Sequence, residues 1–501
     1  MWLGSIPLQG CQNLYHQGGI ECAVHSLIYF DKTFITLNLL IMSSANNHDF
    51  TPIDYISSNP MDRLSNVTKE ILDRGEYIFD VHCHVFDVKT INILYFVSRI
   101  IRDNISADSV VAHRPLIDST GAEMKYLSIS EPELYDNLLL KRKFDTDKDW
   151  EDVIQEVELL GDTDKSASIS SDKIDGSGSQ IIRNIGLLGK GTHEEIYEVY
   201  MDKFGIHNFP DLVGGNKELI ITGLMMDLEQ GWDVWVRKNI QEVVDELKIL
   251  SGEKPVLPFL ILDPRRMGRS GEENLEYLFD KAFKSFPSFF GVKLYPGLGY
   301  LPSDYRLREI FKICAEKNIP VLSHCGGELI SSKADNSIKV YDGSNEITIT
   351  GNNRKTIARK LNHPKWWAPV LQEFSDLKLN IAHFGSSKSW TRYPNNEEYK
   401  DGTEDKNRVV EILELMQKYP NVYSDFSYSF TDQDIYNDLK KLINKFDFLK
   451  DRLLFGTDFW VVIPEGDLVE EQKMFLKEFA AYRDQFIRDN TYRYLFDMIT
   501  V

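Results

Sequence analysis

Cysteine is scarce in this sequence and shows no paired spacing. The five cysteines, spread over 501 residues, are Cys11, Cys22, Cys83, Cys314 and Cys325. A disulfide-stapled extracellular scaffold needs a denser and even-numbered set, so that class is excluded. An odd, sparse set predicts reduced thiols and a cytoplasmic protein.

Positive charge and long apolar runs are also in short supply. Lysine and arginine number 57 against 77 acidic residues, which gives a formal net charge of −20. A surface of this sign repels nucleic acid and anionic membranes, so neither is expected as a partner. The apolar run at 27–42 carries Asp31 and Lys32 and is too short to span a bilayer.

The first 41 residues lack a clear structural period. No basic segment precedes their apolar run, as it would in a signal peptide. At Met42 the sequence changes to Met-Ser-Ser-Ala-Asn-Asn, which is polar. We therefore expect residues 1–41 to be a non-structural extension and residues 42–501 to form the folded domain. A membrane-associated leader is the competing interpretation of residues 1–41.

One apolar stretch, at 77–87, contains a His-x-His motif. It begins as the β-branched and aromatic run that is typical of a buried parallel strand. In an extended chain His82 and His84 project from the same face, about 7 Å apart. Two neutral imidazoles on one face can bind one borderline-soft metal ion. Strand histidines are more often structural, so the motif needs support from the rest of the chain.

Seven further strand candidates follow, and helical segments separate most of them. They lie at 219–227, 256–263, 290–295, 320–324, 378–383, 422–425 and 452–458. Strands that alternate with helices pair in parallel, and eight such units predict a (β/α)8 TIM barrel of the α/β class. The main rival, a doubly wound open sheet, would show a glycine-rich phosphate turn after its first strand. The His-x-His motif stands at that place instead.

A long insertion, at 106–215, separates the first two strand candidates. It has helical patterns at 131–143, 147–160 and 193–204, and a polar stretch at 161–179 that is rich in Asp, Ser, Gly and Lys. This composition predicts a mainly helical, partly disordered insertion. The insertion is either a lid over the site or a surface addition that the fold tolerates.

Polar side chains gather at the carboxyl ends of the predicted strands, where a TIM barrel has its active site. These side chains belong to His82, His84, Asp227, Asp263, Lys293, Tyr295, His324, His383, Asp425 and Asp458. Four of the 11 histidines end three apolar strands, which random placement would not produce. The strand ends therefore predict one metal-binding site.

This ordered set resembles the amidohydrolase superfamily, in particular the amidohydrolase-2 branch of metal-dependent TIM-barrel hydrolases and decarboxylases. The stretches that carry the resemblance are Asp80-Val-His-Cys-His84, Gly291-Val-Lys-Leu-Tyr-Pro296, Val321-Leu-Ser-His-Cys-Gly326, Asn380-Ile-Ala-His-Phe-Gly385 and Leu454-Phe-Gly-Thr-Asp458. The resemblance implies that a divalent metal, with zinc the expected ion, is surrounded by His82, His84, His324 and Asp458. It also implies that His383 polarises the substrate or positions the water.

Lys293 matches the position where binuclear members of the superfamily carry a carbamylated lysine between two metals. We therefore expect one metal per chain, or two if Lys293 is carbamylated. Alternatively, Lys293 faces inward and pairs with a carboxylate such as Asp227 or Asp263. Asp425 is either structural or holds an imidazole in one tautomer. A helix cap is the alternative role of Asp458.

Five residues near the strand ends are candidates for substrate binding. Arg265 and Arg266 could clamp a substrate carboxylate or merely solvate a loop. Tyr295, Trp390 and Trp460 could line the pocket. The alternative role of the two tryptophans is to anchor loops.

The sequence thus predicts a metal-dependent hydrolase that cleaves a C–N or C–O bond of a small molecule. The ion would activate a water molecule, and Asp458 would act as the general base. Decarboxylation of an unsaturated or aromatic acid at the same site is the alternative. A metal-binding barrel without turnover, acting as a docking module, is the second alternative. A small-molecule substrate is the expected partner, and a homo-oligomer is left open.

Overall fold

The computed structural model describes part of the chain. The described residues are 54–85, 87–90, 192–233, 236, 238–326, 330–334, 336–386, 389–390, 393, 406–462 and 467–497. The chain divides into two units, Met1–Asp54 and Tyr55–Val501, and every element below belongs to the second. The extension predicted at 1–41 and the insertion's patterns at 131–143, 147–160 and 161–179 lie outside the described residues.

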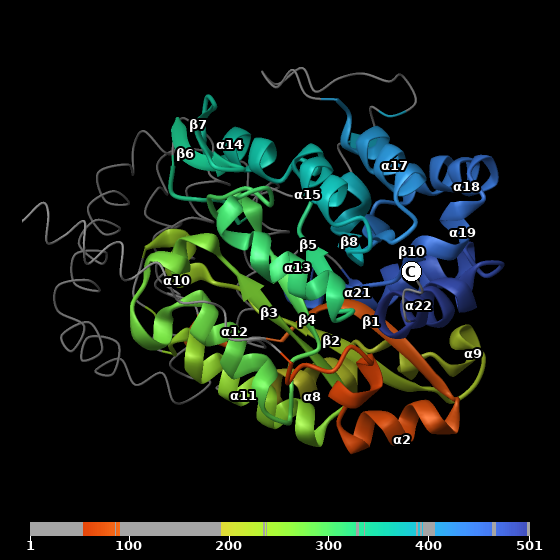
Figure 1. The fold of residues 1–501 in the computed structure, drawn as a ribbon. Coiled ribbons are helices and arrows are strands. Elements are labelled where there is room, and N and C mark those ends of the chain that lie inside the picture. Colours follow the sequence, from red (N-terminus) through yellow and green to blue (C-terminus); the bar gives the residue numbers. More distant parts are fainter. Residues whose placement is uncertain are drawn as a thin grey trace, which may run out of the picture. The chain divides into compact units, whose positions relative to one another are not determined.

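Eight parallel strands form a nearly closed barrel (Figure 1). In order around the sheet they are β1 (Tyr77–His84), β2 (Glu218–Leu224), β3 (Val256–Leu262), β4 (Gly291–Leu294), β5 (Val321–Ser323), β8 (Leu379–Ile381), β9 (Val422–Asp425) and β10 (Leu453–Leu454). Backbone hydrogen bonds also join the last strand to the first. The N–H of Val81 donates to the carbonyl of Phe455 at 3.0 Å, and the N–H of Asp458 donates to that of His82 at 2.7 Å. The TIM-barrel prediction is confirmed.

Helices precede, connect and follow the strands, and the ones longer than five residues include the helix that the pattern at 193–204 predicts. They are α2 (Asn66–Arg74), α8 (His193–Lys203), α11 (Ile240–Glu253), α12 (Leu275–Lys284), α13 (Arg308–Glu316), α15 (Ala368–Glu373), α17 (Arg408–Lys418), α18 (Tyr436–Lys445), α21 (Leu468–Glu478) and α22 (Asn490–Phe496). Shorter helices are α9 (Pro210–Val213), α10 (Leu228–Trp232), α19 (Phe448–Arg452) and α20 (Phe459–Val462). Local chemistry sets their starts: at α11, Asn239 and Glu242 form a reciprocal capping box.

The connection from β5 to β8 contains elements that the sequence did not predict. An antiparallel hairpin, β6 (Ser337–Asp342) and β7 (Asn345–Thr350), precedes helix α14 (Arg354–Leu361). Each hairpin strand buries a single side chain, Val340 or Ile349, against Leu301, Ile357 and Leu361. Since most of the hairpin is exposed or half-exposed, it lacks the apolar run by which the barrel strands are recognised.

Aromatic and aliphatic side chains fill the amino-terminal half of the barrel. The core there includes Phe79 early in β1, Phe290 just before β4, and Tyr494 of α22. The Tyr494 hydroxyl donates to the carbonyl of Val321, the first residue of β5, at 2.8 Å. Helix α22 therefore closes the amino ends of the strands, opposite the ends that carry the predicted site.

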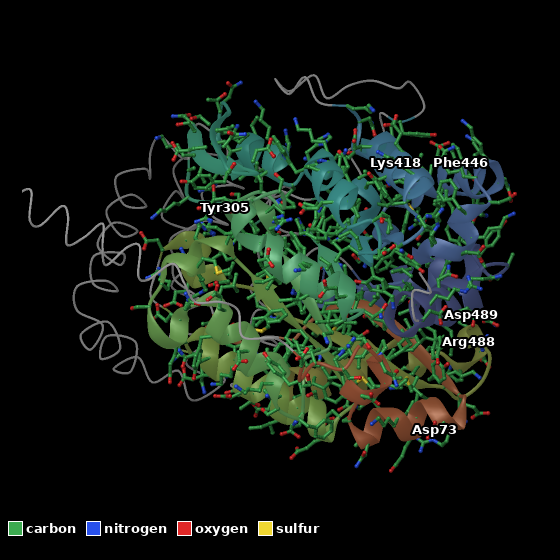
Figure 2. All side chains as sticks on the ribbon, viewed as in Figure 1. Asp73, Tyr305, Lys418, Phe446, Arg488 and Asp489 are labelled. Carbon is green, nitrogen blue, oxygen red and sulfur yellow. The ribbon has the colours of Figure 1, made fainter. Side chains whose placement is uncertain are left out.

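Charged side chains lie mainly on the outside of this core (Figure 2). Arg488 and Asp489, labelled in Figure 2, form one such surface pair at 2.7 Å. Exposed pairs of this kind contribute about 0–1 kcal/mol each, so apolar burial carries most of the stability.

Two observations bear on the predicted cytoplasmic location. Within the described ranges, no helix is long and apolar enough to cross a membrane. Cys83, Cys314 and Cys325 are buried free thiols. The cytoplasmic location stays a prediction.

Candidate metal centre

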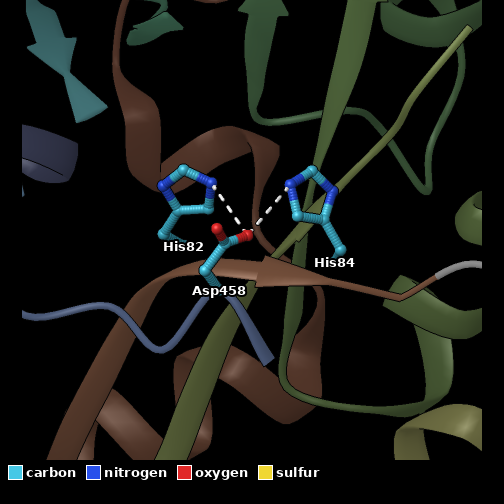
Figure 3. Close-up of side chains that lie close together, drawn as sticks. All are labelled: His82, His84 and Asp458. Atoms are coloured by element: carbon cyan, nitrogen blue, oxygen red, sulfur yellow. Dashed lines mark ion pairs between the residues drawn. The ribbon is translucent and has the colours of Figure 1, made fainter. Parts of the chain in front are cut away.

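Two histidines of β1 and one carboxylate after β10 form the centre of the site. The Nε2 atoms of His82 and His84 lie 3.6 and 3.5 Å from the same oxygen, Oδ1, of Asp458 (Figure 3). Two ligands that each lie about 2.1 Å from one tetrahedral ion would be about 3.4 Å apart. The three side chains therefore have the spacing of ligands to a single ion.

The other two predicted histidines join this group. Nε2 of His383 lies 4.0 Å from Oδ2 of Asp458 and 3.0 Å from Nδ1 of His324. The His383 ring also lies against the ring of His82, with 4.8 Å between their centroids. The structure thus assembles every histidine that the strand ends predicted, together with Asp458.

The outer nitrogen of each histidine faces an oxygen acceptor. These contacts are His82 Nδ1 with Asp425 Oδ2 (3.1 Å), His84 Nδ1 with Leu224 O (3.3 Å), His383 Nδ1 with Ser427 O (3.0 Å), and His324 Nε2 with Gly326 O (2.5 Å). We assign the imidazole protons from these partners, because a carbonyl or carboxylate oxygen can only accept. Each ring then presents a lone pair from its inner nitrogen.

Four lone pairs and a carboxylate repel one another unless positive charge lies among them. Lys293 meets part of that need, because its Nζ lies 3.2 Å from Nε2 of His82. Burial, with the charge of Lys293 acting in the same direction, lowers the pKa of His82 to about 3 and that of His383 to about 4. The imidazoles are therefore neutral at pH 7, which is the form that binds metal. Imidazole nitrogen and carboxylate oxygen together are a donor set that suits zinc.

Asp425, at the end of β9, fixes two of the rings. Its Oδ2 faces His82 and accepts from Asn380 Nδ2 at 2.8 Å, while its Oδ1 accepts from the N–H of His383 at 3.0 Å. Burial acts to raise the pKa of Asp425, but His82 and the N–H donors hold it well below its usual value. The carboxylate stays charged and keeps the proton of His82 on Nδ1. This is the tautomer-holding role considered for it from the sequence.

Ser427 and Asn380 support the site, and the sequence reasoning gave neither a role. The Ser427 hydroxyl hydrogen-bonds Asp425 and lies 3.0 and 2.9 Å from Nδ1 of His82 and His383. Ser427 stands two residues after Asp425, and that alternation was a signal that the two share a face.

His383 and Asp458 lie in turns rather than in strands. β8 ends at Ile381 and β10 at Leu454, and the φ angles of His383 and Asp458 are +64° and +52°. A non-glycine residue in this region costs about 1–3 kcal/mol and is held by its surroundings. The prediction that both residues end extended strands is wrong, although both side chains reach the site.

Lys293 is buried in the same group of side chains. Burial lowers its pKa to about 7, and the charges of Asp458 and Asp425 partly offset that effect. The alternative in which Lys293 pairs with Asp227 or Asp263 is not what the structure shows. Its carbamylation, and with it a second metal, stays a prediction.

Asp227 and Asp263 instead bind the two arginines of the neighbouring turn. Arg265 donates through Nε and Nη2 to Asp263 at 2.9 and 2.5 Å. Arg266 donates through Nε and Nη2 to Asp227, with 2.9 Å between Nη2 and Oδ1. Since both guanidinium groups already hold carboxylates of the chain, the predicted substrate clamp gains no support from this geometry.

The aromatic candidates differ in their surroundings. Tyr295 stacks on His324, with ring centroids 3.9 Å apart and planes 12° apart, so it lies in the site. Trp390 donates to the carbonyl of Phe384 at 3.0 Å and packs on Phe384 and Phe426, which is the environment of a loop anchor. Trp460 is buried within α20.

Comparison with known proteins agrees with the resemblance seen in the sequence. A family model described as amidohydrolase, Amidohydro_2, matches residues 253–496. No curated protein matches the chain.

Solved structures of low similarity include a TIM-barrel protein, an amidohydrolase and a decarboxylase. A TIM-barrel protein from Bordetella bronchiseptica is 17% identical at a TM-score of 0.38, with 60% of this chain and 84% of that one covered. Amidohydrolase 2 from Bifidobacterium longum subsp. infantis is 13% identical at 0.35, with 65% and 92% covered. A 2,6-dihydroxybenzoate decarboxylase from Rhizobium is 15% identical at 0.34, with 57% and 86% covered.

Proposed function

We propose that the chain is a metal-dependent enzyme that hydrolyses a C–N or C–O bond of a small molecule, since residues 253–496 match the amidohydrolase family model. One observation supports this most. The Nε2 atoms of His82, His84 and His383 lie within 4.0 Å of one carboxylate, Asp458, and Nδ1 of His324 lies 3.0 Å from Nε2 of His383. The outer nitrogen of each of these four rings faces an acceptor. A histidine cluster that served only packing would not need its lone pairs to face one another.

The residues that would hold the ion are His82, His84, His324 and Asp458. Three imidazoles and one carboxylate favour zinc over magnesium or calcium, which prefer oxygen ligands. When bound, zinc supplies a Lewis acid that polarises a carbonyl group and acidifies water. One ion per chain fits this donor set, and a second would require carbamylated Lys293.

Asp458 and His383 have different roles in the proposed reaction. Asp458 acts as the general base and then returns the proton to the leaving group. In the assigned tautomer, Nδ1–H of His383 donates to Ser427, so its Nε2 can only accept. His383 therefore orients the attacking water and does not donate to a substrate carbonyl, which narrows the two roles that the resemblance implied.

The test combines metal analysis with isotope labelling. Zinc-loaded protein is screened on amides, esters, lactones and aromatic acids in ¹⁸O-labelled water. Hydrolysis places label in the product carboxylate or alcohol, whereas decarboxylation releases CO2 and leaves a solvent-derived proton on carbon. Turnover with label in the product is the expected result. Decarboxylation alone would replace the proposed reaction, and a protein that takes up no metal would overturn the proposal.

A further inference from the structure

One buried carboxylate, Asp80, is hydrogen-bonded to the backbone beside two of the proposed ligands. It lies in β1 two residues before His82 and has no exposed surface. Its Oδ1 accepts from the N–H of His82 and from the N–H of Thr457, each at 3.0 Å. Since Thr457 directly precedes Asp458, this one oxygen ties together the two chain segments that carry His82 and Asp458.

The second oxygen of Asp80 is held from outside the barrel strands. Oδ2 accepts from the Thr457 hydroxyl and from the hydroxyl of Tyr200, each at 2.5 Å. Tyr200 belongs to helix α8, 120 residues further along the chain, and its side chain is fully buried. A buried carboxylate without hydrogen-bond donors is costly, so the four donors fix both its position and its orientation.

Helix α8 also supports the turn that carries Asp458. The rings of Tyr200 and Phe204 lie 4.8 and 5.3 Å from the ring of Phe459, measured between centroids. Phe459 follows Asp458, whose φ of +52° has to be maintained by its neighbours. The helix therefore contacts both the hydrogen-bond network before Asp458 and the side chain after it.

His193, the first residue of α8, contacts Asp87, which follows the His-x-His motif in the chain. Nδ1 of His193 lies 2.5 Å from Glu246 Oε2 and 3.5 Å from Asp87 Oδ2. The ammonium of Lys238 bridges the same two carboxylates. Because Lys238 already supplies the cation, this cluster acts as an ion-pair anchor. α8 is thus bound to β1 and its continuation on both sides of His82 and His84.

We propose that Tyr200 is a positioning residue of the metal centre. Through Asp80 it sets the separation of His82 and Asp458, and it thereby links the placement of α8 to metal affinity. This inference rests on the proposed function, because it assumes that these two side chains hold an ion. Tyr200 is not itself a proposed ligand: its hydroxyl acts through Asp80, and its ring packs on Phe459.

The first test removes one hydroxyl group. We expect Tyr200→Phe to weaken zinc binding by about 10- to 100-fold, the usual effect of losing a partner behind a metal ligand. Tyr197→Phe is the matched control, because Tyr197 lies in the same helix, is also buried and is not a donor to Asp80. Affinity is measured by competition with a chromophoric chelator, and the melting temperature of each zinc-free protein is measured alongside.

A second pair of variants gives an independent answer. Thr457→Val removes the other hydroxyl that donates to Oδ2 of Asp80, whereas Thr457→Ser keeps it. We expect the valine variant to lose zinc affinity and the serine variant to retain it. Should Tyr200→Phe fail to fold, this pair decides the matter.

Two results would overturn the inference in different ways. If wild type binds zinc and folded Tyr200→Phe binds it equally well, Tyr200 has only a structural role. If the two Thr457 variants bind zinc alike, the hydroxyl donors to Asp80 do not set the zinc affinity, and the inference loses its basis. A lower melting temperature with unchanged affinity has the same meaning. If wild type takes up no zinc, the proposed function itself fails, and the inference fails with it.

Discussion

The two ends of the barrel each bury a lysine, and they treat it differently. At the carboxyl end, Lys293 lies 3.2 Å from His82 and near the charges of Asp458 and Asp425. At the amino end, Lys378 precedes β8, and its Nζ is buried without a hydrogen-bond partner among the described residues. Burial lowers the pKa of Lys293 to about 7 and that of Lys378 to about 8. Lys293 belongs to a polar network, whereas Lys378 is buried with Arg63 and Asp497 as the charged groups that act on it.

Stability and chemistry are located at opposite ends of the barrel. The amino end is closed by aromatic packing around Phe79, Phe290 and Tyr494, which stabilises the fold. The carboxyl end holds buried polar atoms whose hydrogen bonds fix proton positions at the proposed site. Substitutions at the two ends should therefore separate loss of stability from loss of metal and activity.

The largest expected effect is loss of the metal. His82→Ala should abolish stoichiometric zinc binding, because it removes one of the four proposed ligands. His363→Ala is a matched control, since His363 is buried but caps the distant turn Pro364–Trp367. Elemental analysis after dialysis measures the zinc content of each protein. Equal zinc in His82→Ala and wild type would contradict the site.

Next in size is the loss of stability at the amino end. Phe290→Ala should lower the free energy of unfolding by about 3–5 kcal/mol, the cost of removing a buried ring and leaving a cavity. Denaturant unfolding of the zinc-free protein measures it, and zinc affinity of the folded variant should change little. A variant that keeps its stability, or loses zinc first, would break the division between the two ends.

A catalytic defect without metal loss should follow His383→Asn. We expect kcat to fall by about 100-fold, the lower scale for an acid–base group. The ratio kcat/KM should fall with it, because the contact that orients water is made in the transition state. Zinc content should be retained, whereas Asp458→Asn should reduce both kcat and zinc. Full kcat in His383→Asn would refute its assignment.

The smallest expected effect is a gain of stability. The folded pKa of Lys378, about 8, lies below the ordinary 10.5, so between these values the unfolded chain binds more protons. Wild-type stability should therefore rise from pH 8 toward pH 10. The Lys378→Met variant should be more stable than wild type by about 2 kcal/mol at pH 7, and its stability should not show the rise between pH 8 and pH 10. Parallel pH profiles for the two proteins would contradict the account.

The sequence predicted the barrel because each barrel strand is a short apolar run that ends in a polar residue. It predicted the candidate ligands for the same reason, since carboxyl ends of parallel strands meet at one face. It could not predict that His383 and Asp458 lie in positive-φ turns, because surrounding contacts impose those conformations. The hairpin β6–β7 was missed because each strand buries only one side chain.

Long-range polar partners were also beyond the sequence. Tyr200 reaches Asp80 across 120 residues, and no local pattern marks that contact. Arg265 and Arg266 looked free to bind a substrate, yet Asp263 and Asp227 engage them. The sequence thus predicts which residues stand at a strand end, while three-dimensional packing decides which of them pair with each other.

Anomalous X-ray diffraction at the zinc edge, on crystals of the zinc-loaded protein, tests the central claim most directly. We expect one strong peak within bonding distance, about 2.0–2.2 Å, of the inner nitrogens of His82, His84 and His324 and of the carboxylate of Asp458. A second cluster of histidine, aspartate and glutamate among the described residues, formed by Asp87, His193 and Glu246, should show no peak, because Lys238 already bridges its carboxylates. A peak at that cluster, with none at Asp458, would contradict the account.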